Sequence, residues 1–154
     1  MPEYRERLWP TPWIYVSSLL LIPASILVLA PVSLPAGIVT GIVLYAALVG
    51  SLTLTAPVIE VSGGRFRAGR AEVPLEVTGT AVAALGDAAR IERGTGLDAR
   101  AFLVIRGWIR DVVRVPIEDP ADPAPYWLVS TRRADELAAA INGSRRPDVE
   151  GEQA

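Results

Sequence analysis

The feature that most constrains the fold is a stretch without charge that runs from Trp13 to Thr55. It contains two apolar runs, "WIYVSSLLLIPASILVLA" (13–30) and "AGIVTGIVLYAALVGSLTLT" (36–55), separated by "PVSLP". As helices these runs reach roughly 27 and 30 Å at 1.5 Å per residue, which matches the hydrocarbon core of a bilayer. The sequence therefore predicts a transmembrane helical hairpin, with prolines that end one helix and start the next.

Arginines on both flanks of the hairpin predict its orientation. Two precede the first span and three follow the second, whereas the connecting turn carries no charge. Basic residues concentrate on the cytoplasmic side of a membrane, so we expect a bacterial inner (plasma) membrane protein with both termini cytoplasmic. A cleaved signal peptide fits less well, because "MPEYRER" carries both signs of charge and a second apolar run follows. A soluble protein with two buried helices is disfavoured by the length of both runs.

Small residues in the second span predict close helix packing. Gly37 and Gly41 lie on one helical face, and Gly50 extends it. Packing within the hairpin is favoured over a dimerisation face. The spans hold no ionisable side chain, which argues against a proton or ion pathway.

Beyond Pro57 the pattern changes to short strand-like runs separated by turn residues. A helix over 132–142 follows, with Ser130 or Thr131 as its cap and Gly143 as its stop. We expect four segments: a cytoplasmic N-terminal segment (1–12), the hairpin (13–55), a cytoplasmic β domain (57–143) and a disordered tail (144–154). The predicted strands are 58–62, 65–69, 71–77, 80–85, 101–106, 112–117 and 126–130.

Strands followed by one terminal helix are typical of pleckstrin-homology-like domains, in which the helix plugs one end of a β-sandwich. A split barrel fits the same pattern nearly as well. The predicted fold class is therefore an α+β membrane protein with a two-helix hairpin and a small PH-like β-sandwich or split barrel.

Composition excludes several kinds of chemistry. The chain has no cysteine, no histidine and no lysine, so disulfides, thiol nucleophiles, Cys/His zinc sites and lysine Schiff bases are ruled out. No convincing nucleophile–base pair or carboxylate pair remains. We therefore predict a protein that is not an enzyme and that has no cofactor and no metal. The net charge of −2 disfavours nucleic-acid binding.

Tyr126, Trp127 and Arg132 form the first candidate surface, which would bind a partner or an anion. Adjacent strand residues face opposite sides of a sheet. The alternative is therefore a rigid, proline-containing lead from "DPADPAP" into the last strand, with one aromatic in the core.

Arg65, Arg67 and Arg70 form the second candidate surface, for anionic lipid headgroups. Each arginine near an anionic leaflet contributes about 1 kcal/mol. The alternative is that these residues act only as a topology signal during insertion. A third set, Arg106, Arg110 and Arg114 around Trp108, is not assigned a role by the sequence.

Several segments together resemble a known family. They are "YRERLWPTPW" (4–13), the two spans, "VPLEVTG" (73–79) and "DPADPAPYWLVSTRRADELAAAI" (119–141). The chain is similar from about Tyr4 to Ile141 to the actinobacterial membrane-protein family of unknown function numbered thirty ninety-three. This resemblance implies an actinobacterial inner-membrane protein with a cytoplasmic domain, and it implies no activity, substrate or cofactor.

The function expected from the sequence is a membrane-anchored binding or scaffolding protein that presents the β domain at the inner face of the plasma membrane. The alternative is an accessory subunit whose hairpin assembles with a larger transporter or envelope enzyme. The expected partners are the lipid bilayer, another membrane or cytoplasmic protein, and anionic headgroups, but not nucleic acid.

Overall fold

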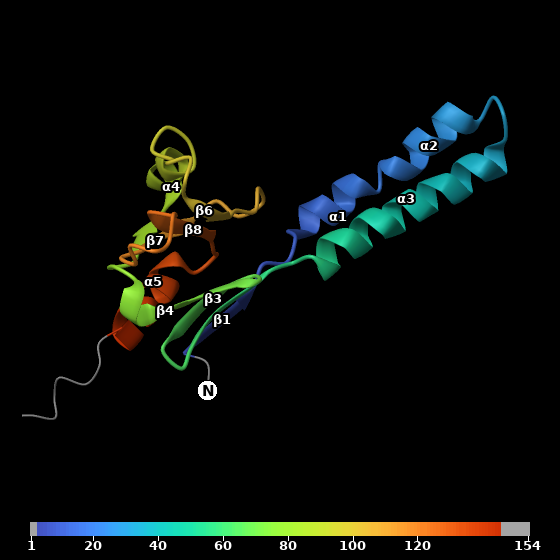
Figure 1. Ribbon diagram of the computed structural model, residues 1–154. Coiled ribbons are helices and arrows are strands. Elements are labelled where there is room, and N and C mark those ends of the chain that lie inside the picture. The colour runs from blue at the N-terminus through green and yellow to red at the C-terminus, as the bar shows by residue number, and fades with distance from the viewer. Residues whose placement is uncertain (1–2, 146–154) are drawn as a thin grey trace, which may run out of the picture. The chain divides into compact units, whose positions relative to one another are not determined.

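The computed structural model describes residues 3–145, which fold as two compact units (Figure 1). The helical unit is Trp9–Ala56. The β domain joins the N-terminal residues up to Leu8 to the chain from Pro57 onward. The fold is a mixed α+β structure with two apolar N-terminal helical runs and two β-sheets.

The first apolar run is broken once. It forms α1 (Pro12–Ser18) and α2 (Leu21–Leu29), with a turn at Leu19–Leu20. Pro23 explains the break, because it has no N–H to donate to the carbonyl of Leu19, and its ring crowds that carbonyl. Ile22 instead donates to the Leu19 carbonyl at 3.1 Å. The break in the first apolar run thus lies one turn before the proline.

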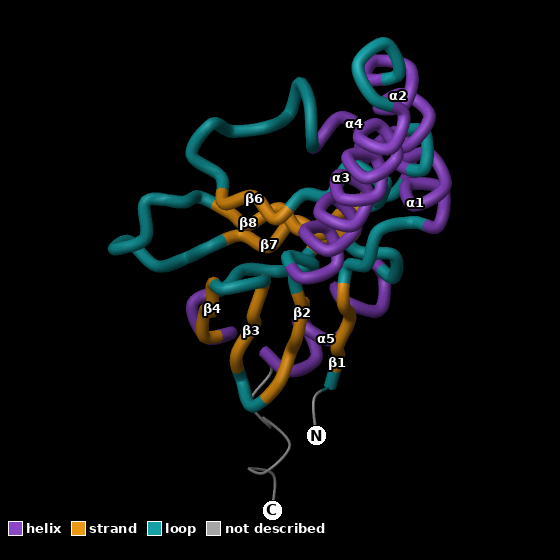
Figure 2. The backbone as a smooth tube through the Cα atoms, turned by 90° about the vertical axis from the view of Figure 1, so that its right-hand side faces the viewer, coloured by secondary structure: helices purple, strands orange, loops and turns teal. Residues whose placement is uncertain are grey.

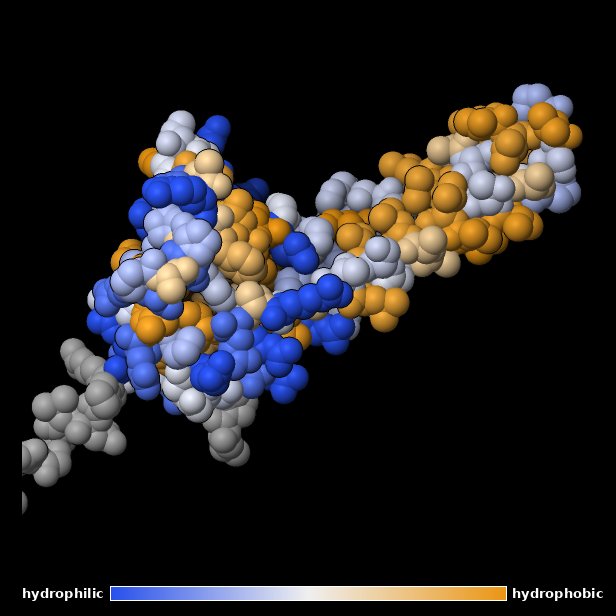
Figure 3. Space-filling view, in the orientation of Figure 1, coloured by the Kyte–Doolittle hydropathy of each residue, from blue (hydrophilic) through white to orange (hydrophobic). Residues whose placement is uncertain are grey.

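The second run forms α3 (Leu34–Leu54), which begins two residues earlier than the sequence predicted. Ser33 caps it, since its Oγ accepts a hydrogen bond from Ala36 N. The segments Pro12–Leu29 and Leu34–Leu54 are long and apolar enough to cross a membrane, and only 6% and 11% of them are buried. Figure 3 shows apolar residues spread over the surface of these helices.

Glycines allow α2 and α3 to pack closely. A Cβ on Gly41 would lie 2.7 Å from the Ile22 Cα, and a Cβ on Gly37 would lie 2.9 Å from the Ile26 Cα. No larger residue fits at either position without moving a backbone. Gly50 differs, because a Cβ there would meet nothing within 4 Å.

The first sheet contains a strand that the sequence analysis did not predict. Its order is β1 (Tyr4–Arg7), β2 (Val58–Ser62), β3 (Arg65–Ala68) and β4 (Ala71–Pro74), all antiparallel (Figure 2). The N-terminal segment pairs with the strand that follows the helical unit. The helical unit is therefore inserted in the chain between two neighbouring strands.

The second sheet has the order β5 (Val82–Ala84), β7 (Val112–Pro116), β8 (Tyr126–Ser130) and β6 (Phe102–Val104). Its β6–β8 pair is parallel and its other pairs are antiparallel. The 3-10 helix η1 (Leu75–Val77) occupies the end of the run predicted as one strand over 71–77. Pro74, at the end of β4, precedes this change of conformation.

Two helices complete the β domain. The short helix α4 (Gly86–Glu92) lies between the predicted strands 80–85 and 101–106. The terminal helix α5 (Ala134–Arg145) starts later and runs further than the predicted 132–142, so Gly143 is inside it rather than at its stop. Residues 144 and 145 of the predicted disordered tail belong to α5, and 146–154 lie outside the described residues.

The main core of the β domain lies between the two sheets and α5. Its largest fully buried side chains come from the inner faces of both sheets and from the apolar face of α5, and they include Phe66, Ile59, Val113, Val129 and Leu137. A second, smaller cluster packs on the other face of the second sheet, against α4 and the segment that follows it. Both faces of β8 are therefore covered, and all five of its residues are buried.

Candidate functional site

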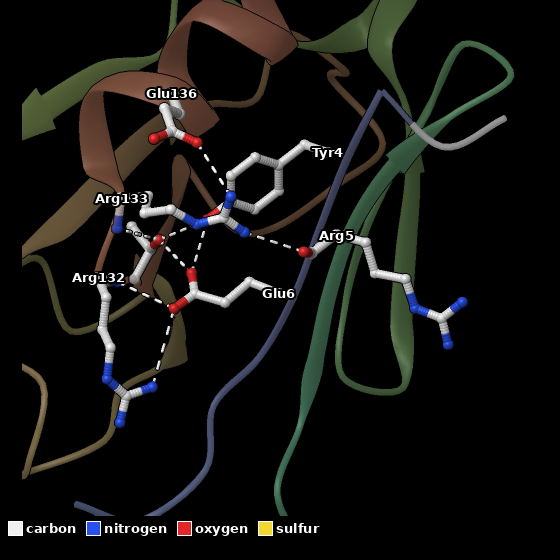
Figure 4. Close-up of polar contacts among 7 residues, drawn as sticks. Tyr4, Arg5, Glu6, Arg132, Arg133 and Glu136 are labelled. Carbon is white, nitrogen blue, oxygen red and sulfur yellow. Dashed lines mark hydrogen bonds and ion pairs between the residues drawn. The ribbon is translucent and has the colours of Figure 1, made fainter.

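A buried carboxylate joins the N-terminal strand to the start of α5 (Figure 4). Glu6 is 8% exposed. Its Oε2 accepts hydrogen bonds from Tyr4 Oη at 2.6 Å and from Thr131 Oγ1 at 2.5 Å. Its Oε1 accepts one from Arg132 N at 3.2 Å and lies 3.8 Å from Arg132 Nη1. We call Tyr4, Glu6, Thr131, Arg132 and Arg133 the Glu6 cluster.

The alternation of a strand explains why Glu6 is buried. In β1 the side chains of Tyr4 and Glu6 point into the domain, while Arg5 and Arg7 are exposed. Thr131 directly follows β8 and is fully buried. Because an unpaired buried carboxylate is costly, the two hydroxyls and the backbone amide are needed to satisfy it.

Arg133 closes the Glu6 cluster from outside. Its guanidinium lies 4.7 Å from the centre of the Tyr4 ring, and it donates to the backbone carbonyl of Arg5 and to Glu136 Oε2, both at 3.0 Å. Its backbone N–H donates to Thr131 Oγ1 at 3.1 Å. The residues just before α5 thus hold β1 through both main-chain and side-chain contacts.

The electrostatics of the cluster favour a structural role. Burial, followed by the hydrogen bond to Glu6, raises the pKa of Tyr4 above its ordinary value. The phenol therefore stays protonated and donates to the carboxylate, and it does not act as a base or a nucleophile near neutral pH. The arrangement fastens an edge strand to the body of the domain.

The structure does not bring Tyr126, Trp127 and Arg132 together as one surface. Tyr126 and Trp127 are 3% and 5% exposed and face opposite sides of the second sheet. Trp127 packs in the main core, with its ring 5.8 Å from Phe66 and 4.7 Å from Phe102. Tyr126 lies in the smaller cluster, where its hydroxyl accepts from Asp98 N at 2.8 Å. Arg132 is paired with Glu6.

The proline-rich lead into β8 has the turn geometry that the sequence suggested. Asp119 and Asp122 accept hydrogen bonds from Ala121 N and Ala124 N, both at 2.8 Å. These Asx contacts rigidify the approach to Tyr126. The arrangement matches the alternative interpretation of "DPADPAPYW" as a lead into the last strand.

Arg65, Arg67 and Arg70 are exposed, and two of them, Arg65 and Arg67, share the outer face of β3. Arg65 pairs with Glu72 and stands at the β2–β3 turn, next to Ser62. Arg67 is in the middle of a row across the sheet, between Glu60 and Glu72. Arg70 lies in the turn between β3 and β4.

Opposite charges alternate across the outer face of the first sheet. The register places Arg5 beside Glu60, Glu60 beside Arg67, and Arg67 beside Glu72. Opposite charges on facing strands stabilise the pairing. Within this row, the face is a mixed-charge solvent surface rather than a basic patch.

Within the described residues, 3–145, no three acidic side chains are grouped so as to hold a metal ion. An open depression of about 370 Å³ is lined by Thr80, Asn142, Gly143 and Arg145. Asn142 bonds both the N–H and the carbonyl of Ala81 at its rim, at 2.8 and 2.9 Å. That side chain ties α5 to the segment before β5.

The sequence analysis missed the Glu6 cluster, although a signal was present. "YRER" has the same alternation as "RFRA" in β3, but its charged residues led us to assign it to a membrane flank. Two inward positions occupied by Tyr4 and Glu6 would have indicated a strand with one buried acid. The partner, Thr131, is 125 residues away from Glu6 and could not be inferred from local pattern.

Comparison with protein families gives one result. The family described as "Protein of unknown function (DUF3093)" matches residues 3–141. The match covers both units, including β1 and most of α5. No curated protein and no solved structure matches the chain.

Proposed function

Because the chain belongs to the family described as Protein of unknown function (DUF3093), we propose a function from its own architecture. The protein is a membrane-anchored, non-catalytic binding or scaffolding protein. It presents a PH-like β domain at the inner face of the plasma membrane, with both termini cytoplasmic.

The observation that carries this proposal is the insertion of the helical unit between paired strands. Arg7 pairs with Val58, and Leu8 N donates to the Pro57 carbonyl at 3.0 Å. The two connections therefore leave the β domain at one place. A helical pair that enters and leaves a bilayer on the same side meets this requirement, whereas a single crossing would separate β1 from β2 by the thickness of the membrane.

The surface of the helical unit supports membrane anchoring. Its large apolar side chains are exposed, for example Leu27 at 77% and Val28 at 75%. Within α1, α2 and α3 the buried residues are Ser18, Gly37 and Gly41. A bilayer covers such a surface, whereas water would penalise it at roughly 25 cal/mol per Å². Arginines flank the helical unit on the side of the β domain, which favours a cytoplasmic location for that domain.

The β domain supports a binding role better than a catalytic one. Its buried acid, Glu6, and its buried tyrosine, Tyr4, are hydrogen-bonded to each other and to the residues before α5, and the raised pKa of Tyr4 keeps its phenol protonated. Two four-stranded sheets and a terminal helix support the PH-like assignment. The parallel β6–β8 pair does not follow from that assignment.

Cysteine accessibility tests the proposed topology directly, because the natural chain has no cysteine. One variant carries Val32→Cys, at an 84% exposed position in the turn between α2 and α3. A second carries Ala121→Cys, in the exposed loop before β8. In intact spheroplasts, a membrane-impermeant maleimide should label residue 32 and leave residue 121 unlabelled.

In inside-out vesicles the pattern should reverse, and the natural chain controls for background labelling. Labelling of residue 121 from outside intact spheroplasts would overturn the proposed orientation. Extraction of the protein by alkaline carbonate would overturn the anchoring itself.

The alternative function is an accessory subunit whose helices assemble with a larger membrane protein. Gly50 favours this alternative. A Cβ added at Gly50 would meet nothing within 4 Å, so this position of α3 is open to a helix of another protein. If this alternative holds, Gly50→Leu should abolish co-purification of the partner. If the β domain recruits the partner, that variant should retain it.

A further inference from the structure

The strand register defines one end of the β domain as the hairpin-side end. There β1 ends at Arg7, β2 begins at Val58, and the chain enters the helical unit through Leu8 and Pro57. The β2–β3 turn, with Gly63 and Gly64, lies at the other end of these strands. Each residue of the first sheet can therefore be placed along its strand by how near it lies to the strand ends at Arg7 and Val58.

The turn between β3 and β4 returns to the hairpin-side end. Gly69 N donates to the Val58 carbonyl at 2.8 Å, and a Cβ on Gly69 would lie 3.4 Å from the Pro57 Cβ. Arg70 directly follows and is exposed. Arg7 and Arg70 therefore flank the place where the chain leaves the domain.

The loop after β6 belongs to the same end. Arg106 N donates to Ser130 Oγ at 3.0 Å. Thr131, which follows Ser130, donates a hydrogen bond to Glu6. Glu6 immediately precedes Arg7. We call Arg7, Arg70 and Arg106 the basic rim.

Two acidic side chains near the basic rim accept hydrogen bonds within the β domain. Glu6 is buried against the hydroxyls and Arg132, and Asp111 Oδ1 accepts from Gly86 N at 3.1 Å. Acids accumulate at the opposite strand ends instead. Glu3 lies near the β2–β3 turn, because its backbone N–H donates to the Val61 carbonyl. Asp119 and Asp122 lie in the loop before β8.

Short connections join the hairpin-side end of the β domain to the helical unit. Three residues link α3 to β2, and four link β1 to α1. At 3.3–3.6 Å per residue these connections reach at most about 18 Å. At physiological salt, attraction between charges is screened over about 8 Å. A β domain held by connections this short can bring its arginines to within that distance of the headgroups.

We propose that the basic rim of Arg7, Arg70 and Arg106 holds the β domain against anionic lipid headgroups of the bilayer that carries the helical unit. The inference rests on the proposed membrane anchoring. Of the arginines that the sequence predicted for headgroups it keeps Arg70. It leaves out Arg65, which stands at the far end of β3 and pairs with Glu72, and Arg67, which lies between Glu60 and Glu72. Each arginine near an anionic leaflet should shift the ratio of apposed to free domain about fivefold.

The test uses the full chain reconstituted in vesicles of phosphatidylcholine, with or without phosphatidylglycerol. A fluorophore is attached at Gly107→Cys, an exposed position beside Arg106 at which a Cβ meets nothing within 4 Å. All vesicles contain the same amount of a lipid with a quencher on its headgroup. Phosphatidylglycerol should increase quenching, and salt should reverse the increase.

The variant R7Q/R70Q should lose the increase in quenching, because the ratio of membrane-apposed to free β domain should fall about 25-fold. The control variant R65Q/R145Q removes the same two positive charges as R7Q/R70Q, but at the opposite end of the strands and of α5. It should show the same increase in quenching as the natural protein. Equal quenching with and without phosphatidylglycerol, or equal loss in both double variants, would overturn the inference.

Flotation after an alkaline wash separates this inference from the proposed function. Protein that floats but shows no dependence on anionic lipid refutes the basic rim alone. Protein that the wash removes refutes the membrane anchoring and the rim with it.

Discussion

The helical unit and the β domain are stabilised in opposite ways. In the helical unit most large apolar side chains are exposed, and two glycines allow close contact between α2 and α3. In the β domain the large apolar side chains point inward, and residues as distant as Glu6 and Thr131 share a hydrogen bond. The comparison shows that the β domain covers its apolar side chains through long-range contacts within the chain, whereas the helical unit leaves most of its own exposed.

The largest effect is expected from removing the buried carboxylate of the β domain. Glu6→Ala should lower the free energy of unfolding by about 3 kcal/mol, because it breaks a buried charged network and leaves the amide of Arg132 without its acceptor. Urea unfolding of the full chain in detergent, followed by tryptophan fluorescence, measures this loss.

Glu60→Ala provides the matched control for Glu6→Ala. Glu60 lies on the next strand, on the outer face, 3.8 Å from an exposed Arg5. Its removal should change the free energy by no more than about 0.5 kcal/mol. Equal losses in the two variants would show that burial of Glu6 does not matter.

The helical unit should be broken by size rather than by charge. Gly41→Leu should cost about 2 kcal/mol in helix packing, since even its Cβ would overlap the backbone of Ile22. The distance between spin labels on cysteines introduced at Leu27 and Val39 should increase. Gly50→Leu should leave that distance unchanged, and an increase there too would contradict the packing described.

Tyr4→Phe should produce a smaller effect that depends on pH. Loss of the hydroxyl should cost about 1.5 kcal/mol near neutrality. Burial and Glu6 raise the pKa of Tyr4 in the folded state, whereas in the unfolded chain it ionises near its ordinary value of about 10. The raised pKa stabilises the natural protein fully below pH 10, and this contribution is lost progressively at higher pH.

The difference in stability between the natural chain and Tyr4→Phe should therefore narrow as the pH rises above 10. Urea unfolding at a series of pH values measures it. Tyr45→Phe, in α3, should not alter unfolding of the β domain at any pH. A difference for Tyr4→Phe that stays constant up to pH 11 would contradict the role given to burial.

The smallest expected effect is a gain. Gly143 lies inside α5 with nothing near its Cβ position. Gly143→Ala should stabilise the β domain by about 0.5 kcal/mol, because alanine loses less backbone entropy in a helix. A lower melting temperature for this variant would indicate that α5 ends before Gly143, as the sequence had suggested.

Local pattern predicted the elements of the β domain better than their pairing. The runs at 58–62 and 126–130 coincide with β2 and β8. The parallel β6–β8 pair was not anticipated, since no periodicity within 101–106 reports which strand lies beside it. The candidate surface of Tyr126, Trp127 and Arg132 failed to assemble for the same reason, because exposure depends on what covers each face.

The sequence by itself determined that this chain contains two apolar helices and a separate β domain, because composition and period act over neighbouring residues. Only the tertiary structure decided that "YRER" is a strand, that Glu6 is buried against Thr131, and which arginines lie at the strand ends from which the chain leaves the β domain. Those facts depend on strand register between segments separated by the whole helical unit or by most of the chain, and register is set by packing rather than by local preference.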